Sequence, residues 1–81
     1  MRLDKYLKVS RLIKRRTVAN EACDAGRVEV NGKIARASYD VKAGDTVTIR
    51  FGERALTVEV VSVQENAGKA DAAAMYRETA R

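Results

Sequence analysis

Apolar positions in the first quarter of the chain recur at the spacing of a helix. They predict a short helix over residues 2–13, and Ser10 is placed to interrupt or bend its end. A second helix is predicted over residues 17–25. Its ends are indicated by Thr17, which can accept an N-cap hydrogen bond, and by Gly26, which tolerates the left-handed conformation that often follows a helix.

From residue 27 onward the apolar spacing changes to two, which is typical of strands. Two alternating segments flank Asn31-Gly32, a dipeptide that favours a tight β-hairpin. Further strands are predicted over residues 46–51 and 56–63, joined through Gly52-Glu53-Arg54. The sequence therefore predicts a small antiparallel sheet after the two helices.

The pattern breaks at Asn66-Ala67-Gly68, and the alanine-rich segment over residues 69–80 predicts a final helix. We expect one α+β domain over residues 1–65 and a helical tail over residues 66–81. In this architecture two N-terminal helices pack on a small antiparallel sheet, and the short C-terminal helix is peripheral.

The chain has 81 residues, of which 46% are hydrophobic, enough for one compact domain. It contains no histidine and a single cysteine, Cys23. These counts exclude imidazole metal sites, Ser-His and Cys-His nucleophile pairs, an intramolecular disulfide and a thiolate-rich zinc site. No apolar run approaches the roughly 20 residues of a membrane span, and the N-terminus lacks the apolar stretch of a signal peptide. We therefore expect a cytoplasmic protein without a cofactor and without enzymatic activity.

The net charge of +5 is concentrated at the N-terminus. Residues 1–16 carry seven basic side chains and one acidic side chain, whereas residues 17–81 carry nine basic and ten acidic ones. This asymmetry is expected of a surface that binds a polyanion. The candidate RNA-binding residues are Arg2, Lys5, Lys8, Arg11, Lys14, Arg15 and Arg16. The first four recur every three residues, which places them on one broad face of the first helix.

Lys14-Arg15-Arg16 directly precedes the second predicted helix, where the helix dipole favours negative charge by about 0.3–1 kcal/mol. A phosphate bound there would meet free backbone N–H groups and three cationic side chains. Together with the basic face of the first helix, this arrangement favours phosphate binding over a solvated run of charges.

Other polar or reactive residues have simpler explanations. Tyr6 is expected to pack in the core rather than to stack on a base, and Cys23 is expected to be an inert packing thiol. Asp4 is placed to hold neighbouring cations in position. Carboxylate catalysis by Asp4, Glu21 and Asp24 is disfavoured, because the basic residues around them offer ion-pair partners and no metal ligands accompany them.

In their order and spacing, several fragments resemble the S-four RNA-binding domain family over residues 1–63. They are Arg2-Leu3-Asp4-Lys5-Tyr6-Leu7-Lys8, Ser10-Arg11, Arg15-Arg16-Thr17, Ala22, Gly26-Arg27-Val28, Val30-Asn31-Gly32 and Val41-Lys42-x-Gly44-Asp45. The resemblance implies two helices against a small, bent antiparallel sheet, with basic helix side chains that grip structured RNA. The chain departs from many members in lacking a proline before Ser38.

Among stand-alone members, factors of ribosome-associated quality control in Gram-positive bacteria are similar at the N-terminal run over residues 1–17, at Arg50-Phe51-Gly52 and at Ala74-Met75-Tyr76. This resemblance implies a factor that binds large ribosomal subunits obstructed by peptidyl-tRNA and contacts large-subunit rRNA and the P-site tRNA. It also implies support for an RqcH-type factor that adds C-terminal alanine tails. We expect the protein to be monomeric. By position, Arg2 and Arg16 match the family's main rRNA-contacting arginines.

Four alternatives stay open at this point. The chain could be the RNA-recognition accessory module of an rRNA- or tRNA-modifying enzyme. It could be a heat-shock-type recycling factor of the large subunit, although its short tail lacks the long basic extension of that group. It could bind duplex DNA through the basic helix. A membrane-surface helix is least favoured, because the basic helix lacks a broad apolar face.

Overall fold

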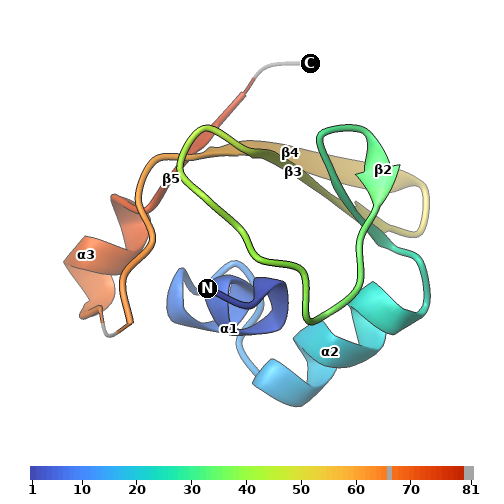
Figure 1. Ribbon diagram of the computed structural model, residues 1–81, viewed down its shortest axis with the longest axis horizontal. Coiled ribbons are helices and arrows are strands. Elements are labelled where there is room, and N and C mark those ends of the chain that lie inside the picture. The colour runs from blue at the N-terminus through green and yellow to red at the C-terminus, as the bar shows by residue number, and fades with distance from the viewer. Residues whose placement is uncertain (66, 80–81) are drawn as a thin grey trace.

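The computed structural model describes residues 1–65 and 67–79 and shows an α+β fold in two layers (Figure 1). The elements in chain order are α1 (Leu3–Val9), α2 (Arg16–Asp24), β1 (Val28–Val30), β2 (Lys33–Ile34), β3 (Thr46–Phe51), β4 (Arg54–Val60), α3 (Lys69–Ala73) and β5 (Tyr76–Glu78). All strand pairs are antiparallel, in the order β2-β1-β3-β4-β5. Helices α1 and α2 lie on one side of this sheet, and the predicted fold class is confirmed.

The core lies between the helices and one face of the sheet. From α1, Leu3, Tyr6 and Leu7 are fully buried. In β3, Val47 and Ile49 are buried while the alternate residues are partly or fully exposed, because successive side chains of a strand point to opposite faces. Burying one face in this way fixes the register of the sheet and the position of both helices on it.

Helix α1 is shorter than predicted because the chain turns after Val9. Ser10 caps the helix, with its side-chain hydroxyl donating to the Leu7 carbonyl at 3.3 Å. Arg11 then adopts a φ of 65°, in the left-handed region, which cannot continue a right-handed helix. The expected interruption at Ser10 is confirmed, and the expected helix over residues 10–13 is wrong.

Helix α2 begins at Arg16 with Arg15 as its N-cap residue, and no side chain caps it. Thr17 therefore lies inside the first turn, and its predicted role as the N-cap is wrong. Gly26 follows the helix with a φ of 77°, as predicted for a residue that ends a helix in the left-handed conformation.

Two tight turns shape the sheet. Asn31 and Gly32, with φ values of 53° and 85°, form the predicted turn between β1 and β2. The Asn31 side-chain oxygen also accepts the Thr46 backbone N–H at 2.9 Å, which ties this turn to the start of β3. The second turn, at residues 52–53, joins β3 to β4. Strand β4 covers Arg54–Val60 rather than residues 56–63, because Arg54 already pairs with Phe51 across this turn.

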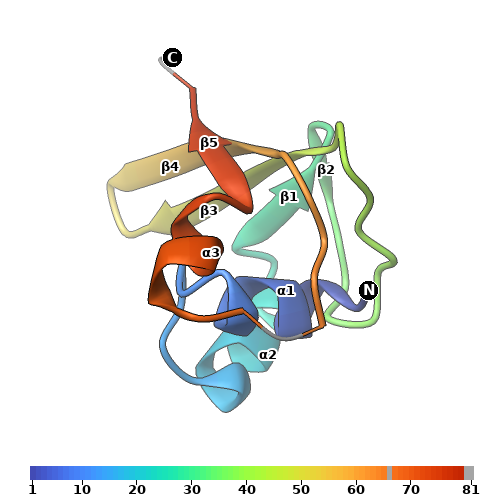
Figure 2. The ribbon, with the colours of Figure 1, turned by 90° about the vertical axis from the view of Figure 1, so that its left-hand side faces the viewer.

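The C-terminal segment contains a short helix, α3, but it does not stay helical to residue 80 as predicted. Residues 76–78 form β5, which pairs with β4 beside α3 (Figure 2). The helix ends at Ala73, and the Met75 side chain after it is fully buried. Burial of Met75 and pairing with the free edge of β4 override the helical propensity of the alanines. The break predicted at Asn66-Ala67-Gly68 is confirmed at Ala67 and Gly68, which are not helical, with Gly68 as the N-cap residue of α3. Asn66 and the predicted helix end at Ala80 lie outside the described residues.

Candidate nucleic-acid interface

The seven predicted RNA-binding cations come from the start of α1, its last turn, the connection to α2 and the first residue of α2. Six of the seven side chains are exposed, and Lys5 is partly buried. The structure divides most of them into two clusters around separate hollows. We call these the Arg2–Arg16 cluster and the Lys8–Arg11–Lys14 cluster.

In the Arg2–Arg16 cluster, both guanidinium groups point to the Asp4 carboxylate. Arg2 Nε lies 3.2 Å from Asp4 Oδ1, and Arg16 Nε lies 3.4 Å from Asp4 Oδ2. The Asn20 amide donates to Oδ2 at 3.2 Å, and the Lys5 backbone N–H donates to Oδ1 at 2.7 Å. Both carboxylate oxygens of Asp4 therefore accept hydrogen bonds, and the donors come from the start of α1 and from α2. The carboxylate holds the two arginines in position, as predicted.

Burial distinguishes the carboxylate from the cations that it holds. The Asp4 side chain is 3% exposed, whereas those of Arg2 and Arg16 are 51% and 49% exposed. Burial alone would raise the pKa of Asp4, but hydrogen bonds from Arg2, Asn20, Arg16 and the Lys5 backbone together lower the pKa below its ordinary value. The acid therefore stays ionised, and the outer edges of both guanidiniums remain available to an anion.

A hollow of about 470 Å³ opens beside this cluster. Its lining residues are Arg2, Asp4, Arg16, Thr17, Asn20 and Glu21. Asn20 was not predicted as part of the site. Its position four residues after Arg16 in a helix was the available signal, because residues at that spacing share a helix face.

The Lys8–Arg11–Lys14 cluster surrounds a second hollow of about 330 Å³ at the other end of α1. Val9 and Ala67 complete its lining. None of its lining residues is acidic, and none belongs to the first hollow.

Lys5 and Arg15 belong to neither hollow. The Lys5 ammonium forms an ion pair with the exposed Glu65 carboxylate, on the segment that runs past α1 toward α3 (Figure 2). This contact lowers the pKa of Glu65 through a hydrogen bond and charge attraction. Arg15 is exposed at the N-cap of α2. The structure therefore does not bring all seven cations together as one surface.

Tyr6 and Cys23 have the core positions that the sequence predicts. The Tyr6 hydroxyl donates to the Met75 carbonyl at 2.9 Å. Burial raises the pKa of Tyr6, and the nearby Tyr76 adds a smaller effect in the same direction. Burial, with Asp4 and Asp24 nearby, raises the pKa of Cys23 to about 11, which keeps the thiol protonated and unreactive. Across the described residues, no group of three acidic or cysteine side chains could hold a metal ion.

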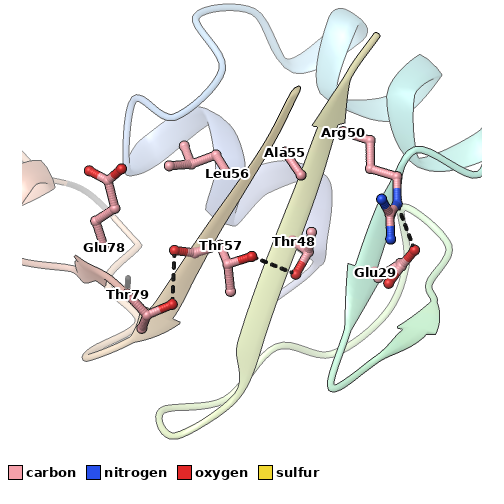
Figure 3. Close-up of a pocket in the computed structure, with 8 residues that line it drawn as sticks. All are labelled: Glu29, Thr48, Arg50, Ala55, Leu56, Thr57, Glu78 and Thr79. Carbon is pink, nitrogen blue, oxygen red and sulfur yellow. Dashed lines mark hydrogen bonds and ion pairs between the residues drawn. The ribbon is translucent and has the colours of Figure 1, made fainter. Parts of the chain in front are cut away.

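A further hollow of about 560 Å³ lies over the opposite face of the sheet (Figure 3). One cation and two acids line it, and the cation, Arg50, pairs with Glu29 at 2.9 Å. Hydroxyl groups also pair across strands, with Thr48 and Thr57 3.2 Å apart. The residues that line this hollow carry no excess positive charge, so we do not assign RNA binding to it.

Comparison with known proteins identifies the domain. The S4 domain family, which the fragments near the N-terminus resemble under the name S-four, matches residues 1–47. An RQC P-site tRNA stabilizing factor of Streptococcus pneumoniae is 58% identical over 76 residues, covering 94% of this chain and 86% of the relative. The protein of the same name from Bacillus subtilis is 57% identical, covering 94% of this chain and 88% of the relative. The chain belongs to this family of S4-domain proteins.

A solved structure supports the same fold. Heat Shock Protein 15 of Vibrio cholerae, described as trimeric, superposes with a TM-score of 0.90 at 34% sequence identity. The match covers 99% of this chain and 82% of the other. Within the part of the chain that the structure describes, no helix is long and apolar enough to cross a membrane.

Proposed function

We propose that this protein is a non-enzymatic, RNA-binding factor of ribosome-associated quality control. The observation that carries the proposal is the Arg2–Arg16 cluster, in which two half-exposed arginines share one buried carboxylate. It occurs in a chain that is 57–58% identical over most of its length to RQC P-site tRNA stabilizing factors. An S4 domain supplies the RNA-binding framework.

In finer detail, the factor binds large ribosomal subunits obstructed by peptidyl-tRNA, in the cytoplasm and as a monomer. Its partners are large-subunit rRNA and the P-site peptidyl-tRNA, together with an RqcH-type factor on the same particle. Holding the tRNA in place supports repeated addition of alanine to the C-terminus of the stalled chain. The names of the relatives support the tRNA-stabilising part of this role.

The cations act as ligands of backbone phosphates. Guanidinium groups offer paired donors in a fixed plane, so Arg2 and Arg16 are suited to orient one RNA segment. The other candidates, Lys5, Lys8, Arg11, Lys14 and Arg15, add charge. With about five or six phosphates neutralised, the logarithm of the affinity falls against the logarithm of the salt concentration with a slope of roughly −4 to −5.

Sedimentation of a lysate through sucrose tests the proposal. The tagged wild-type protein is compared with Arg2→Ala and Arg16→Ala, and with Arg54→Ala as a control that removes an exposed arginine at the first residue of β4. We expect wild type and the control on free large subunits that carry peptidyl-tRNA, and both test variants near the top of the gradient. Wild type at the top of the gradient, or test variants that migrate with the subunits, would contradict the proposal.

A further inference from the structure

The two basic clusters differ in their net charge. The hollow at the Arg2–Arg16 cluster is lined by two arginines and by two acids, Asp4 and Glu21. The hollow at the Lys8–Arg11–Lys14 cluster is lined by three cations and by no acid. Most of the uncompensated positive charge of α1 and its connection to α2 is therefore at the second cluster. It lies away from Arg2 and Arg16, the two positions that match the family's main rRNA-contacting arginines.

The two clusters are also separate in space. Arg2 precedes the first residue of α1, and Lys8 lies in its last turn. Six residues of helix correspond to about 9 Å along the axis. The two hollows share no lining residue. An anion in one hollow is therefore not the anion in the other.

The turn that carries the second cluster is held firmly by the core. The Arg11 N–H donates to the Lys8 carbonyl at 3.0 Å, and the Ile13 N–H donates to the Leu7 carbonyl at 3.0 Å. Ile13 is 9% exposed and Ser10 is 1% exposed, so both anchor the turn from inside. The three cations consequently project from a defined backbone even though their side chains are exposed.

Arg11 occupies a backbone conformation that an arginine does not favour. Its φ of 65° lies in the left-handed region, where a side chain with a Cβ atom costs roughly 1–2 kcal/mol. Glycine adopts this conformation without that strain. Folding stability alone would therefore favour glycine at this position, whereas anion binding favours a long cation.

Within the described part of the chain, the three cations have no ion-pair or hydrogen-bond partner. Among residues 1–65 and 67–79, none of the three side chains forms an ion pair or a hydrogen bond. Lys8 is suited to the negative end of the α1 dipole, but Arg11 and Lys14 lie beyond the helix end. Their convergence on one hollow is therefore not explained by stabilisation of the fold.

We propose that Lys8, Arg11 and Lys14 form a second phosphate-binding site, which takes backbone phosphates of RNA independently of the Arg2–Arg16 cluster. This inference rests on the proposed RNA-binding function and divides it between two sites. The second site supplies most of the salt-dependent affinity, because its charge is uncompensated. The first site orients the RNA, because its arginines are fixed by Asp4.

A matched pair of triple variants tests the division. The test variant combines Lys8→Gln, Arg11→Gln and Lys14→Gln. The control variant combines Lys33→Gln, Lys42→Gln and Arg54→Gln, which removes the same charge from exposed positions elsewhere. Binding of each labelled protein to purified large ribosomal subunits carrying peptidyl-tRNA is measured across a range of salt concentrations. Circular dichroism spectra and melting confirm that each variant is folded.

We expect the slope of log affinity against log salt for the test variant to be shallower than that of wild type by about 2–3, because each lost phosphate contact removes about 0.7–0.9. The control is expected to keep the wild-type slope to within about one. Equal slopes for test variant and wild type, with wild type binding well, would overturn the second site alone. A wild-type protein that does not bind the subunits would overturn the proposed function and this inference with it.

Discussion

Removing the charge of Asp4 separates positioning from simple electrostatics. Asp4→Asn and Glu21→Gln each raise the net charge by one, and both acids line the same hollow. Attraction to phosphate alone therefore predicts tighter RNA binding for both. The contacts of Asp4 predict a different result for the two variants.

Asp4 is bonded on both carboxylate oxygens, whereas Glu21 is exposed and forms no side-chain hydrogen bond among the described residues. An amide at position 4 would turn its own N–H donors toward Arg2 or Arg16, which are donors too. The two arginines would then lose their common anchor and sample many rotamers. We expect Asp4→Asn to weaken RNA binding and Glu21→Gln to strengthen it.

The same contacts set the size of the effect on stability. Breaking a buried ion pair costs about 3–5 kcal/mol. The guanidiniums of Arg2 and Arg16 are 51% and 49% exposed, so water can replace part of what they lose. We therefore expect Asp4→Asn to lower the free energy of unfolding by about 2–3 kcal/mol, a value below the buried-pair range because of that rehydration. In a domain of this size, that corresponds to a fall in the melting temperature of about 8–24 °C.

Two assays check this prediction. Thermal unfolding by circular dichroism gives the stability of each variant. Affinity for purified large ribosomal subunits is then measured at a temperature where wild type, Asp4→Asn and Glu21→Gln are all folded. Tighter binding by Asp4→Asn, by an amount similar to that of Glu21→Gln, would refute the positioning role of Asp4. A melting temperature of Asp4→Asn equal to that of wild type would refute the stability argument.

Three further predictions concern acid unfolding, a hydrogen bond in the core and the backbone conformation of Arg11. The pKa of Asp4 is lowered in the folded state. The stability that ionised Asp4 contributes is therefore complete above the unfolded pKa of about 3.9 and is lost as pH falls through the folded pKa. Acid unfolding followed by circular dichroism should show a smaller loss of stability in this pH range for Asp4→Asn than for wild type. Tyr6→Phe should lower the free energy of unfolding in urea by about 0.5–1.5 kcal/mol, because the Met75 carbonyl keeps its bond from the Val61 N–H at 2.8 Å. Arg11→Gly should leave the melting temperature unchanged or raise it, since it relieves the left-handed strain, and should weaken RNA binding measured by filter retention.

The local elements of this fold could be predicted from the sequence because their signals are local. Asn31-Gly32 specifies a tight turn through its conformational freedom, and Gly26 ends a helix for the same reason. The apolar spacing in α1 identifies Leu3 and Leu7 as core residues. In each case the neighbours in sequence are sufficient to decide the structure.

The remaining elements depend on contacts between distant parts of the chain. β5 forms because β4 offers a free edge and Met75 is buried, and neither fact is visible in the alanine-rich segment itself. The end of α1 depends on how Ile13 reaches the core after the turn. Propensity alone cannot anticipate such tertiary contacts.

The candidate site divides in the same way. The basic residues and the role of Asp4 could be predicted from composition and spacing, since one acid stands among seven cations. The separation into two clusters could not, because it depends on how the connection between the helices folds back. The pairing of Lys5 with Glu65 likewise depends on the path of a segment 60 residues away.

The central claim is that this protein contacts large-subunit rRNA and tRNA in the cell. Ultraviolet cross-linking in living cells, followed by sequencing of the RNA recovered with the tagged protein, tests it most directly. The account predicts that large-subunit rRNA and tRNA are recovered, and that Arg2→Ala combined with Arg16→Ala removes both. Recovery of mainly messenger RNA or small-subunit rRNA, or an unchanged yield from the double variant, would contradict it.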